Sequence, residues 1–350
     1  MEWVNHPTGV NDVPGWPVIG LATDLCVDRI LEVADPFVLY APVLAPTRDF
    51  NYHLYDGAFI DWYSHRKPSR GAGGQYSFFG TAQGPSPPCI GDAVYQTTFV
   101  DVPGASATVV IGVNDGDDVV GYYLDKAFAY HAFARQAGRY RDLNVPGSAF
   151  AAPSAINDVG EIAGYYWDAV GAHGFTLSAG RYQTIDVPGS IGTVVNNLNA
   201  WGDLVGIYVD AAGGQHGFRY HAGHFATIDV PGSAASAVTG INDRGDMTVV
   251  ATDASGNLTG SFVLSAGTWR PVSFPGATQN TVPVAIDDLG RVSGTFATQF
   301  LGTTDGFYTQ VDGTYLRMPL TIVNGMNNRG QVAGWQDGHG FIATLPAFGN

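Results

Sequence analysis

The chain has 350 residues, among them 47 glycines and 20 prolines, with 13% charged residues and a formal net charge of −15. A surface of this charge repels the phosphates of nucleic acids and of anionic membranes, and a hydrophobic content of 45% excludes a disordered chain. We therefore expect a turn-rich globular protein that binds neither nucleic acid nor membrane.

The N-terminal part of the chain combines strand patterns with one long irregular segment. Its first twelve residues lack a basic segment followed by an apolar one, so we expect no secretory signal in the chain as given. Apolar or aromatic runs over residues 18–24 and 75–79 are typical of strands, and residues 25–74 between them have no counterpart elsewhere. Val10-Asn11-Asp12 precedes the first run.

From about residue 100 to the end, two markers alternate about 43 residues apart. One is a Val-Pro-Gly turn, or once Phe-Pro-Gly, with its proline at Pro103, Pro146, Pro188, Pro231 and Pro275. The other is a large apolar residue followed by Asn-Asp or a close variant, at 113–115, 156–158, 198–200, 241–243, 286–288 and 326–328. A repeat of this length indicates one structural unit per period.

Each unit contains four short apolar runs separated by Gly, Asp and Asn clusters, which predicts four strands joined by tight turns. Four strands in a period near 43 are typical of a propeller blade. With Val10-Asn11-Asp12 included there are seven markers. We therefore predict a single all-β, seven-bladed β-propeller over residues 1–350, with a capping insertion over 25–74 between strands two and three of its first blade.

The strands that end at the Asn-Asp markers are expected to lie nearest the propeller axis. The residue two positions before each marker Asn or Asp is glycine or alanine in every unit except one, where it is Asn197. Small side chains suit inner strands that converge on an axis. The last unit ends after its third strand, at 339–343, so we predict that residues 1–5 supply its fourth strand and close the ring.

The units resemble the HAF-type repeat of bacterial, often extracellular, proteins. The resemblance is carried by His131-Ala132-Phe133, by His173-Gly174-Phe175 and by the core from Ile156-Asn157 to Gly164-Tyr165. It departs from the pattern at Thr259-Gly260 and Asp305-Gly306. The resemblance implies an extracellular protein whose export signal has been removed, with the cytoplasm as the alternative, and it implies no reaction, cofactor or catalytic residue.

The insertion concentrates the candidate site residues. We expect the insertion to cap one mouth of the propeller's central channel, on the face of the Val-Pro-Gly turns. Its aromatic side chains are suited to stacking on sugar rings or flat small molecules. Attachment of the cap to the blades is the competing interpretation of these aromatics. The candidate catalytic residues are His53 and His65 as bases and Tyr55 and Tyr63 as acids. The candidate ligand-binding residues are Tyr52, Asp56, Asp61, Trp62, Arg66, Arg70, Asn196 and Asn197.

Polar residues that recur in every blade are expected to be structural. His131, His173, His216 and His339 each begin a third strand, and we expect hydrogen bonds to neighbouring turns instead of metal coordination. Asp168, Asp210 and Asp253 lie in hairpin turns with a following glycine, where a carboxylate satisfies backbone N–H groups.

These patterns predict a propeller that binds a small molecule or an oligosaccharide at a capped channel mouth. We lean toward an enzyme of the lyase, isomerase or cyclase type that uses His and Tyr and needs no metal and no cofactor. A non-catalytic protein-interaction scaffold is the alternative function. A metal-assisted hydrolase, with Asp56 and Asp61 acting beside His53 or His65, is the second alternative.

Overall fold

The computed structural model describes residues 95–277, 279–297, 304–319 and 321–345, together with four short strands earlier in the chain. The chain divides into two units, residues 1–92 and 93–350. In the first unit β1 (Leu39–Tyr40), β2 (Ser69–Arg70) and β3 (Gln75–Ser77) form an antiparallel sheet in the order β1-β3-β2. The fourth short strand is β4 (Ile90–Asp92).

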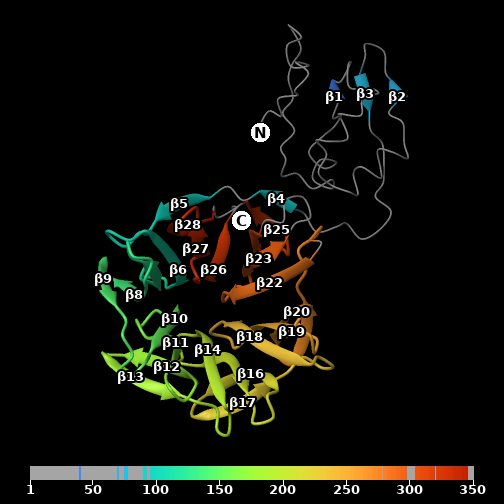
Figure 1. Cartoon of the computed structure of the whole chain (residues 1–350). Helices are drawn as coiled ribbons and strands as arrows, with labels where there is room; N and C mark the ends of the chain where they lie inside the picture. The colour runs from blue at the N-terminus through green and yellow to red at the C-terminus, as the bar shows by residue number, and fades with distance from the viewer. Residues whose placement is uncertain are drawn as a thin grey trace. The chain divides into compact units, whose positions relative to one another are not determined.

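Residues 93–350 form six antiparallel blades arranged around a common axis (Figure 1). The first blade contains β6 (Ala107–Val113), β7 (Val119–Leu124), β8 (Tyr130–Gln136) and β9 (Arg139–Asp142). The second contains β10 (Phe150–Ile156), β11 (Ile162–Trp167), β12 (Ala172–Ser178) and β13 (Arg181–Ile185). The third contains β14 (Gly192–Leu198), β15 (Leu204–Val209), β16 (Gln215–His221) and β17 (His224–Ile228).

The other three blades repeat this arrangement. The fourth blade contains β18 (Ala235–Ile241), β19 (Met247–Thr252), β20 (Leu258–Ser265) and β21 (Thr268–Pro271). The fifth contains β22 (Gln279–Ile286), β23 (Val292–Ala297), β24 (Thr304–Thr309) and β25 (Tyr315–Met318). The sixth contains β26 (Ile322–Met326), β27 (Gln331–Gln336), β28 (His339–Thr344) and β5 (Gln96–Phe99).

The propeller therefore has six blades, and the prediction of seven blades was wrong. The ring is complete without a blade from residues 1–92, because the six Asn-Asp markers from 113–115 to 326–328 each end the first strand of one sheet. The seventh marker, Val10-Asn11-Asp12, lies outside the described residues, as do most of residues 25–74.

Closure occurs through a different strand from the one predicted. The edge of β28 expected for residues 1–5 is occupied by β5, with Phe341 opposite Phe99 and Thr344 opposite Gln96. The physical reason is visible in the chain, since β5 runs directly into the first Val-Pro-Gly turn, as every other fourth strand does. The expectation that the sixth sheet borrows its last strand was right, and the identity of that strand was wrong.

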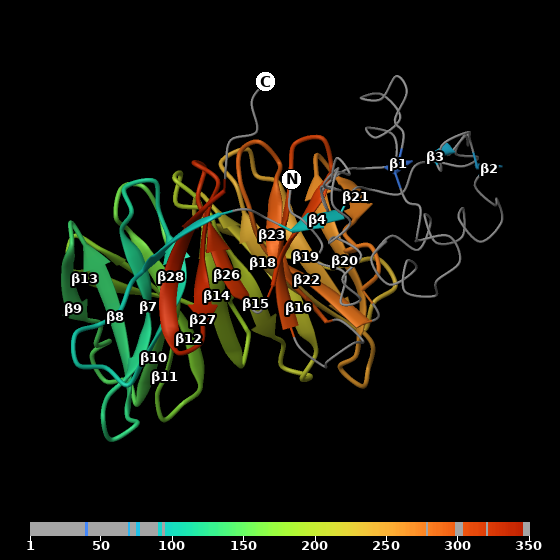
Figure 2. The ribbon, with the colours of Figure 1, turned by 90° about the horizontal axis from the view of Figure 1, so that it is seen from above.

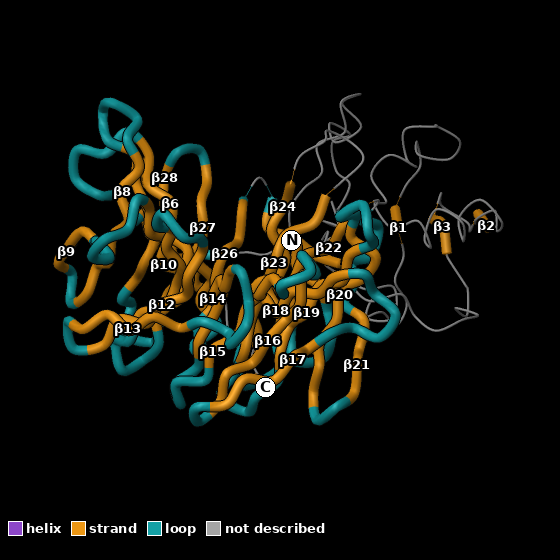
Figure 3. The backbone as a smooth tube through the Cα atoms, turned by 60° about the horizontal axis from the view of Figure 1, so that its bottom comes forward, coloured by secondary structure: helices purple, strands orange, loops and turns teal. Residues whose placement is uncertain are grey.

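The first strand of each blade lies nearest the axis, as the small residues predicted (Figure 1). Seen from the perpendicular direction, the strands run back and forth between two faces of the ring (Figure 2). We call the side of the Val-Pro-Gly turns the Pro-Gly face and the side of the turns that follow the first strands the Asn-Asp face. Strands and turns make up the described ranges, which contain no helix and so none that could cross a bilayer (Figure 3).

A glycine in the second strand of five blades allows close approach to the first strand. A Cβ at Gly206 would lie 2.0 Å from the Val194 carbonyl oxygen. Opposite these glycines, five third-strand phenylalanines are at most 1% exposed, namely Phe133, Phe175, Phe218, Phe307 and Phe341. In the fourth blade Val249 replaces the glycine and its partner Phe262 is only partly buried. The Gly-Tyr and His-Ala-Phe or His-Gly-Phe segments of the repeat therefore form one packing unit.

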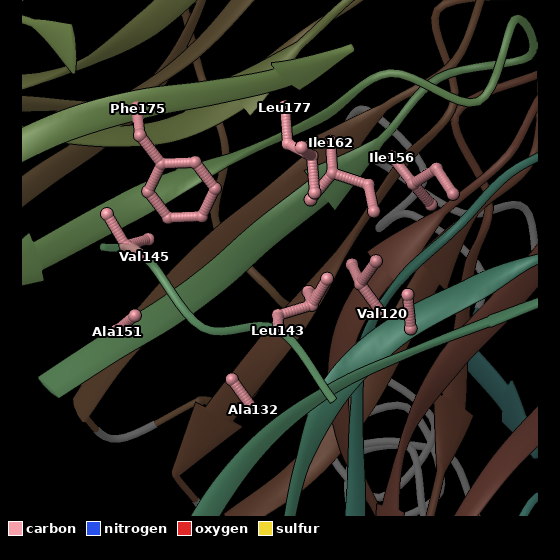
Figure 4. Close-up of a cluster of buried hydrophobic side chains, with 10 residues drawn as sticks. Val120, Ala132, Leu143, Val145, Ala151, Ile156, Ile162, Phe175 and Leu177 are labelled. Carbon is pink, nitrogen blue, oxygen red and sulfur yellow. The ribbon is translucent and has the colours of Figure 1, made fainter. Parts of the chain in front are cut away.

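The hydrophobic core consists of clusters that join adjacent blades. In one of them Val120 and Ala132 of the first blade pack with Ile162 and Phe175 of the second (Figure 4). Another cluster joins Ala333 and Ile342 of the sixth blade to Val110 and neighbouring residues of the first, which seals the junction made by β5. Burying side chains of this size contributes about 1.5–3 kcal/mol each, so the interfaces between blades carry much of the stability.

Candidate functional site

Each first strand contains a β-bulge close to its end on the Asn-Asp face. The register shift skips one residue per blade, and the skipped residues are Ile111, Ser154, Asn196, Thr239, Val284 and Asn324. Three of them bond to the next blade around the ring. Asn196 Nδ2 donates to the Val238 carbonyl at 2.8 Å, Thr239 Oγ1 to that of Pro283 at 2.8 Å, and Asn324 Nδ2 to that of Val110 at 2.9 Å. The bulges therefore connect neighbouring blades close to the axis.

The residue after each bulge must be small because the first strands converge there. A Cβ at Gly240 would lie 2.9 Å from the Val284 carbonyl oxygen, and one at Gly325 would lie 2.5 Å from that of Ile111. This confirms the predicted position of the small residues beside the axis. Asn197 is the polar exception, and its Oδ1 accepts a hydrogen bond from the Leu198 N–H at 2.8 Å.

Six residues that directly follow the first strands form what we call the asparagine ring. They are Asn114, Asn157, Asn199, Asn242, Asp287 and Asn327. Each asparagine donates from Nδ2 to the carbonyl of the next member, at distances from 2.9 to 3.2 Å, and the bond from Asn327 to the Asn114 carbonyl closes the circle at 3.0 Å. Asp287 cannot donate, and at this junction Arg291 Nη2 lies 3.4 Å from the Asn328 carbonyl. These buried asparagines are structural.

The next residue in each turn contributes to a second circle, which we call the carboxylate ring. It consists of Asp115, Asp158, Ala200, Asp243, Asp288 and Asn328. At five of the six junctions between blades, a side-chain oxygen of one member accepts a hydrogen bond from a backbone N–H of the preceding blade. For example, Asp158 Oδ1 accepts from the Asp115 N–H at 2.8 Å, and Asp243 Oδ1 accepts from the Ala200 N–H at 2.8 Å. Within the described residues, the second carboxylate oxygens of Asp158 and Asp243 accept no hydrogen bond.

The carboxylate ring brings four aspartates together around the axis, namely Asp115, Asp158, Asp243 and Asp288. Burial, together with the nearby carboxylate of Asp158, raises the pKa of Asp115. Burial also raises the pKa of Asp243, and the carboxylates of Asp288, Asp158 and Asp203 add to this effect. In the described part of the chain no cationic side chain forms an ion pair with Asp158 or Asp243. The mouth of the channel on the Asn-Asp face therefore favours donors and cations.

A cavity of about 70 Å³ lies within these rings. Its lining includes Asp115, Asp158 and Asp243 of the carboxylate ring, five asparagines of the asparagine ring, and Asn197. One water molecule occupies roughly 30 Å³ of liquid, so the cavity has room for about two waters or one small polar group. A larger ligand would insert one group here and lie across the mouth.

The third blade has the most distinctive turn at this mouth. Trp201 occupies the third position of the turn and is 74% exposed, and its Nε1 donates to the Asp243 carbonyl at 3.1 Å. Asp203, two residues after Trp201, has a buried side chain that accepts hydrogen bonds from Arg219 at 2.7 Å and from His221. Burial alone would raise the pKa of Asp203, but the hydrogen bonds and charges of these two partners outweigh it and lower the pKa.

The recurring histidines belong to the opposite, Pro-Gly face, where they pair with aspartates of the turns. His173 Nδ1 lies 2.9 Å from Asp186, and His216 Nδ1 lies 2.8 Å from Asp229. The hydrogen bond to Asp186 raises the pKa of His173. This confirms the prediction that they bond to neighbouring turns, and within the described ranges no three potential ligands gather in a way that would hold a metal ion.

The turn aspartates also act as predicted. Asp168 Oδ1 accepts the backbone N–H groups of Val170 and Gly171. Asp210 and Asp253 do the same in the third and fourth blades. These carboxylates stabilise hairpins and are not candidates for ligand binding.

Most of the predicted site residues fall outside the described residues. These are Tyr52, His53, Tyr55, Asp56, Asp61, Trp62, Tyr63, His65 and Arg66, and their role stays a prediction. Arg70 is the last residue of β2, opposite Tyr76 of β3.

Asn196 and Asn197 are the predicted site residues that belong to the propeller. We expected them on the Pro-Gly side, but they lie near the other end of β14, beside the Asn-Asp turn. Asn197 lines the cavity, whereas the amide of Asn196 is used in the bond between blades.

Sequence reasoning missed the carboxylate ring because each aspartate looked like an ordinary turn residue. The available signal was the repetition of an acidic residue directly after the marker Asn or Asp, at Asp115, Asp158, Asp243 and Asp288. Equivalent turns of a closed ring gather around the same axis, so an isolated turn residue becomes one member of a circle.

No protein-family model and no curated protein matches this chain. Among solved structures, TolB from Acinetobacter baumannii is similar with a TM-score of 0.47 and 11% identity, over 71% of this chain and 65% of that one, so the match leaves about a third of TolB uncovered. The fucose-recognising lectin of Aleuria aurantia, described as a six-bladed β-propeller, has a TM-score of 0.41 and 13% identity over 70% of this chain and 81% of the lectin.

A gluconolactonase from Xanthomonas campestris is similar at the same level, with a TM-score of 0.44 and 12% identity over 76% of this chain and 99% of the enzyme. None of these similarities identifies a family, a ligand or a reaction for this chain.

Proposed function

We propose that this protein is a ligand-binding β-propeller that holds a small polar molecule or a carbohydrate at the channel mouth on its Asn-Asp face. The observation that carries the proposal is the cavity lined by Asp115, Asp158 and Asp243, where carboxylate oxygens remain without a donor from the described chain. Hydroxyl and ammonium groups are the natural donors to such oxygens, and each charged hydrogen bond contributes about 1.5–3 kcal/mol.

The shape of the site supports a ligand that is only partly enclosed. One hydroxymethyl or amino group fits the cavity of about 70 Å³, and the rest of the molecule would lie over the surrounding turns. The same carboxylates repel anions, so phosphates and uronates are excluded as ligands.

The test is the binding of Asp158→Asn and Asp243→Asn variants to an oligosaccharide array, followed by calorimetric titration of the hits. Each substitution keeps a side-chain oxygen for the backbone N–H of the neighbouring blade and removes the charge. We expect the affinity for the ligand to fall at least about tenfold, which corresponds to the loss of one charged hydrogen bond. The melting temperature should change little.

The matched control is Asp253→Asn, which changes an aspartate that also accepts backbone N–H groups but lies in a turn on the Pro-Gly face. Ligand affinity should be unchanged in this variant. Unaltered binding in both channel variants would refute the proposed site.

The catalytic part of the hypothesis concerns residues outside the described part of the chain. We propose that any lyase, isomerase or cyclase reaction of the full chain uses His53 or His65 as base and Tyr55 or Tyr63 as acid. Replacing His53 or His65 by alanine should then abolish turnover and leave binding by the propeller intact. Full turnover in both variants would overturn these assignments.

The membership of the chain in the HAF-type repeat proteins also stands as a proposal. Its support is the joint packing of the second-strand glycine and the third-strand phenylalanine, which gives the shared pattern a physical basis. If the pattern reflects common ancestry, other members should carry small residues at the position of Gly206 wherever the phenylalanine is present.

A further inference from the structure

The third blade departs from the repeat at the part of the turn that faces the channel mouth. Where the other blades carry aspartate or asparagine in the carboxylate ring, this one has Ala200. At the following position the other five blades have Gly116, Val159, Arg244, Leu289 and Arg329, and this one has Trp201. Equivalent positions in a repeat share one structural role. Two neighbouring residues that differ from the repeat beside a cavity therefore indicate a role in ligand binding in addition to the fold.

Ala200 creates a gap in the carboxylate ring. Alanine has no side-chain oxygen, so the backbone N–H of Asp158 has no acceptor at this position, unlike the corresponding N–H groups of the other blades. Asp158 and Asp243 flank the gap, and both line the cavity together with Ala200. The gap therefore leaves space between two carboxylates that have no cationic partner in the described chain.

Trp201 provides an apolar surface beside this gap. Its indole is 74% exposed and is tied by Nε1 to the Asp243 carbonyl, so the ring is held at the edge of the cavity while most of its surface meets solvent. An aromatic ring fixed in this way is suited to stacking on the apolar face of a sugar ring or to contact with a cation.

The arginines around the mouth do not neutralise the carboxylates at the gap. Arg329 Nη1 donates to the Asp115 carbonyl at 2.8 Å and pairs with Asp117 at 3.3 Å, while Arg244 pairs with Asp246 at 3.0 Å. The potential at the gap therefore favours a ligand with a positive charge over a neutral one of the same shape.

We propose that the mouth binds a sugar residue with a free amino group, with the apolar face of its ring on Trp201 and its ammonium group between Asp158 and Asp243. This inference rests on the proposed function of the same site and specifies its ligand class. The cavity accepts the ammonium group with its adjoining carbon, and the pyranose ring is too large to follow it and lies on the indole.

The experiment is calorimetric titration of the full chain with a glucosamine trisaccharide, compared with the N-acetylated trisaccharide and with maltotriose. We expect the glucosamine trimer to bind at least about tenfold more tightly than the other two. Trp201→Ala should weaken its binding at least about tenfold, and Trp201→Phe should restore most of the affinity because an aromatic face remains.

The matched control is Trp167→Ala, since Trp167 is also exposed, at 49%, but ends β11 on the Pro-Gly face. The Trp167→Ala variant should bind the glucosamine trimer as tightly as the unaltered protein does. Melting curves of Trp201→Ala, Trp201→Phe and Trp167→Ala establish that all three variants fold.

Three outcomes would overturn this inference, and they differ in what they leave of the proposed function. Equal affinity for maltotriose and the glucosamine trimer, still sensitive to Asp243→Asn, would overturn the amino-sugar assignment and leave the ligand site standing. Binding of no oligosaccharide would overturn the inference and the carbohydrate form of the proposed function, leaving only a small polar molecule as the ligand. Trp201-dependent binding of a lysine-rich peptide without binding of the glucosamine trimer would overturn the inference in favour of a protein partner.

Discussion

Replacing Asn114 by alanine removes three hydrogen bonds, one across the junction between the first and second blades and two within its own turn. Asn114 Nδ2 donates to the Asn157 carbonyl at 2.9 Å, and its Oδ1 accepts the N–H groups of Gly116 at 3.0 Å and Asp118 at 2.9 Å. At about 1 kcal/mol for each bond, the free energy of unfolding should fall by about 3 kcal/mol. Urea unfolding measures this loss, and with a slope of about 3 kcal/mol per molar the midpoint moves down by about 1 M.

Two further variants show whether the loss comes from the ring. Asn114→Asp keeps an acceptor for the turn but cannot donate to the Asn157 carbonyl, so it should lose the bond between blades and add repulsion with Asp115. Asn144→Ala is the control, because Asn144 is exposed and lies outside the ring. A loss below about 1 kcal/mol in Asn114→Ala, or an equal loss in Asn144→Ala, would refute the account of the ring.

Three other substitutions or titrations test separate parts of the fold. Gly206→Val places a Cβ about 2.0 Å from the Val194 carbonyl, so we expect a loss of more than about 3 kcal/mol, seen as a large drop in melting temperature or failure to fold. Because folding lowers the pKa of Asp203, its carboxylate stabilises the folded protein at any pH above the pKa of Asp203 in the unfolded chain. This stabilisation is lost as the pH falls through the pKa of Asp203 in the folded protein. The difference in free energy of unfolding between the unaltered protein and Asp203→Asn should therefore shrink from pH 7 toward pH 3. Because folding raises the pKa of His173, its imidazolium stabilises the folded protein at pH values below the unfolded pKa of about 6.5, and this stabilisation is lost as the pH rises through the folded pKa. NMR titration should therefore find the pKa of His173 above 6.5. The substitution Asp186→Asn should lower the pKa of His173.

The blade architecture was predictable because local constraints repeat in every unit. The small residues such as Gly240 and Gly325 mark the convergence of first strands, and the Asn-Asp turns mark their ends. The blade number was not predictable from these markers, because a local pattern does not specify which strand becomes its neighbour. One useful signal was present, since Tyr95-Gln96-Thr97-Thr98 before the first Val-Pro-Gly turn resembles the fourth-strand segment Tyr182-Gln183-Thr184-Ile185.

The candidate site was less predictable because it is formed by the ring and not by any one segment. The sequence alone displays Ala200 and Trp201 as departures from the repeat. It does not reveal that Asp158 and Asp243 lie on either side of this turn, or that one oxygen of each carboxylate is already used by a backbone N–H. Such facts depend on contacts between residues about 43 positions apart, which the repeat brings together only after closure.

The strand β5 has a consequence for the order of events during synthesis. It leaves the ribosome on the order of 240 residues before β28, the strand that it pairs with, and closing so long a loop costs roughly 3 kcal/mol more than closing a short hairpin. The first five blades form from neighbouring segments and can fold as they emerge, whereas the sixth waits for the end of the chain. During that wait, the shortness of β5, which has four residues, limits its pairing with strands of other molecules.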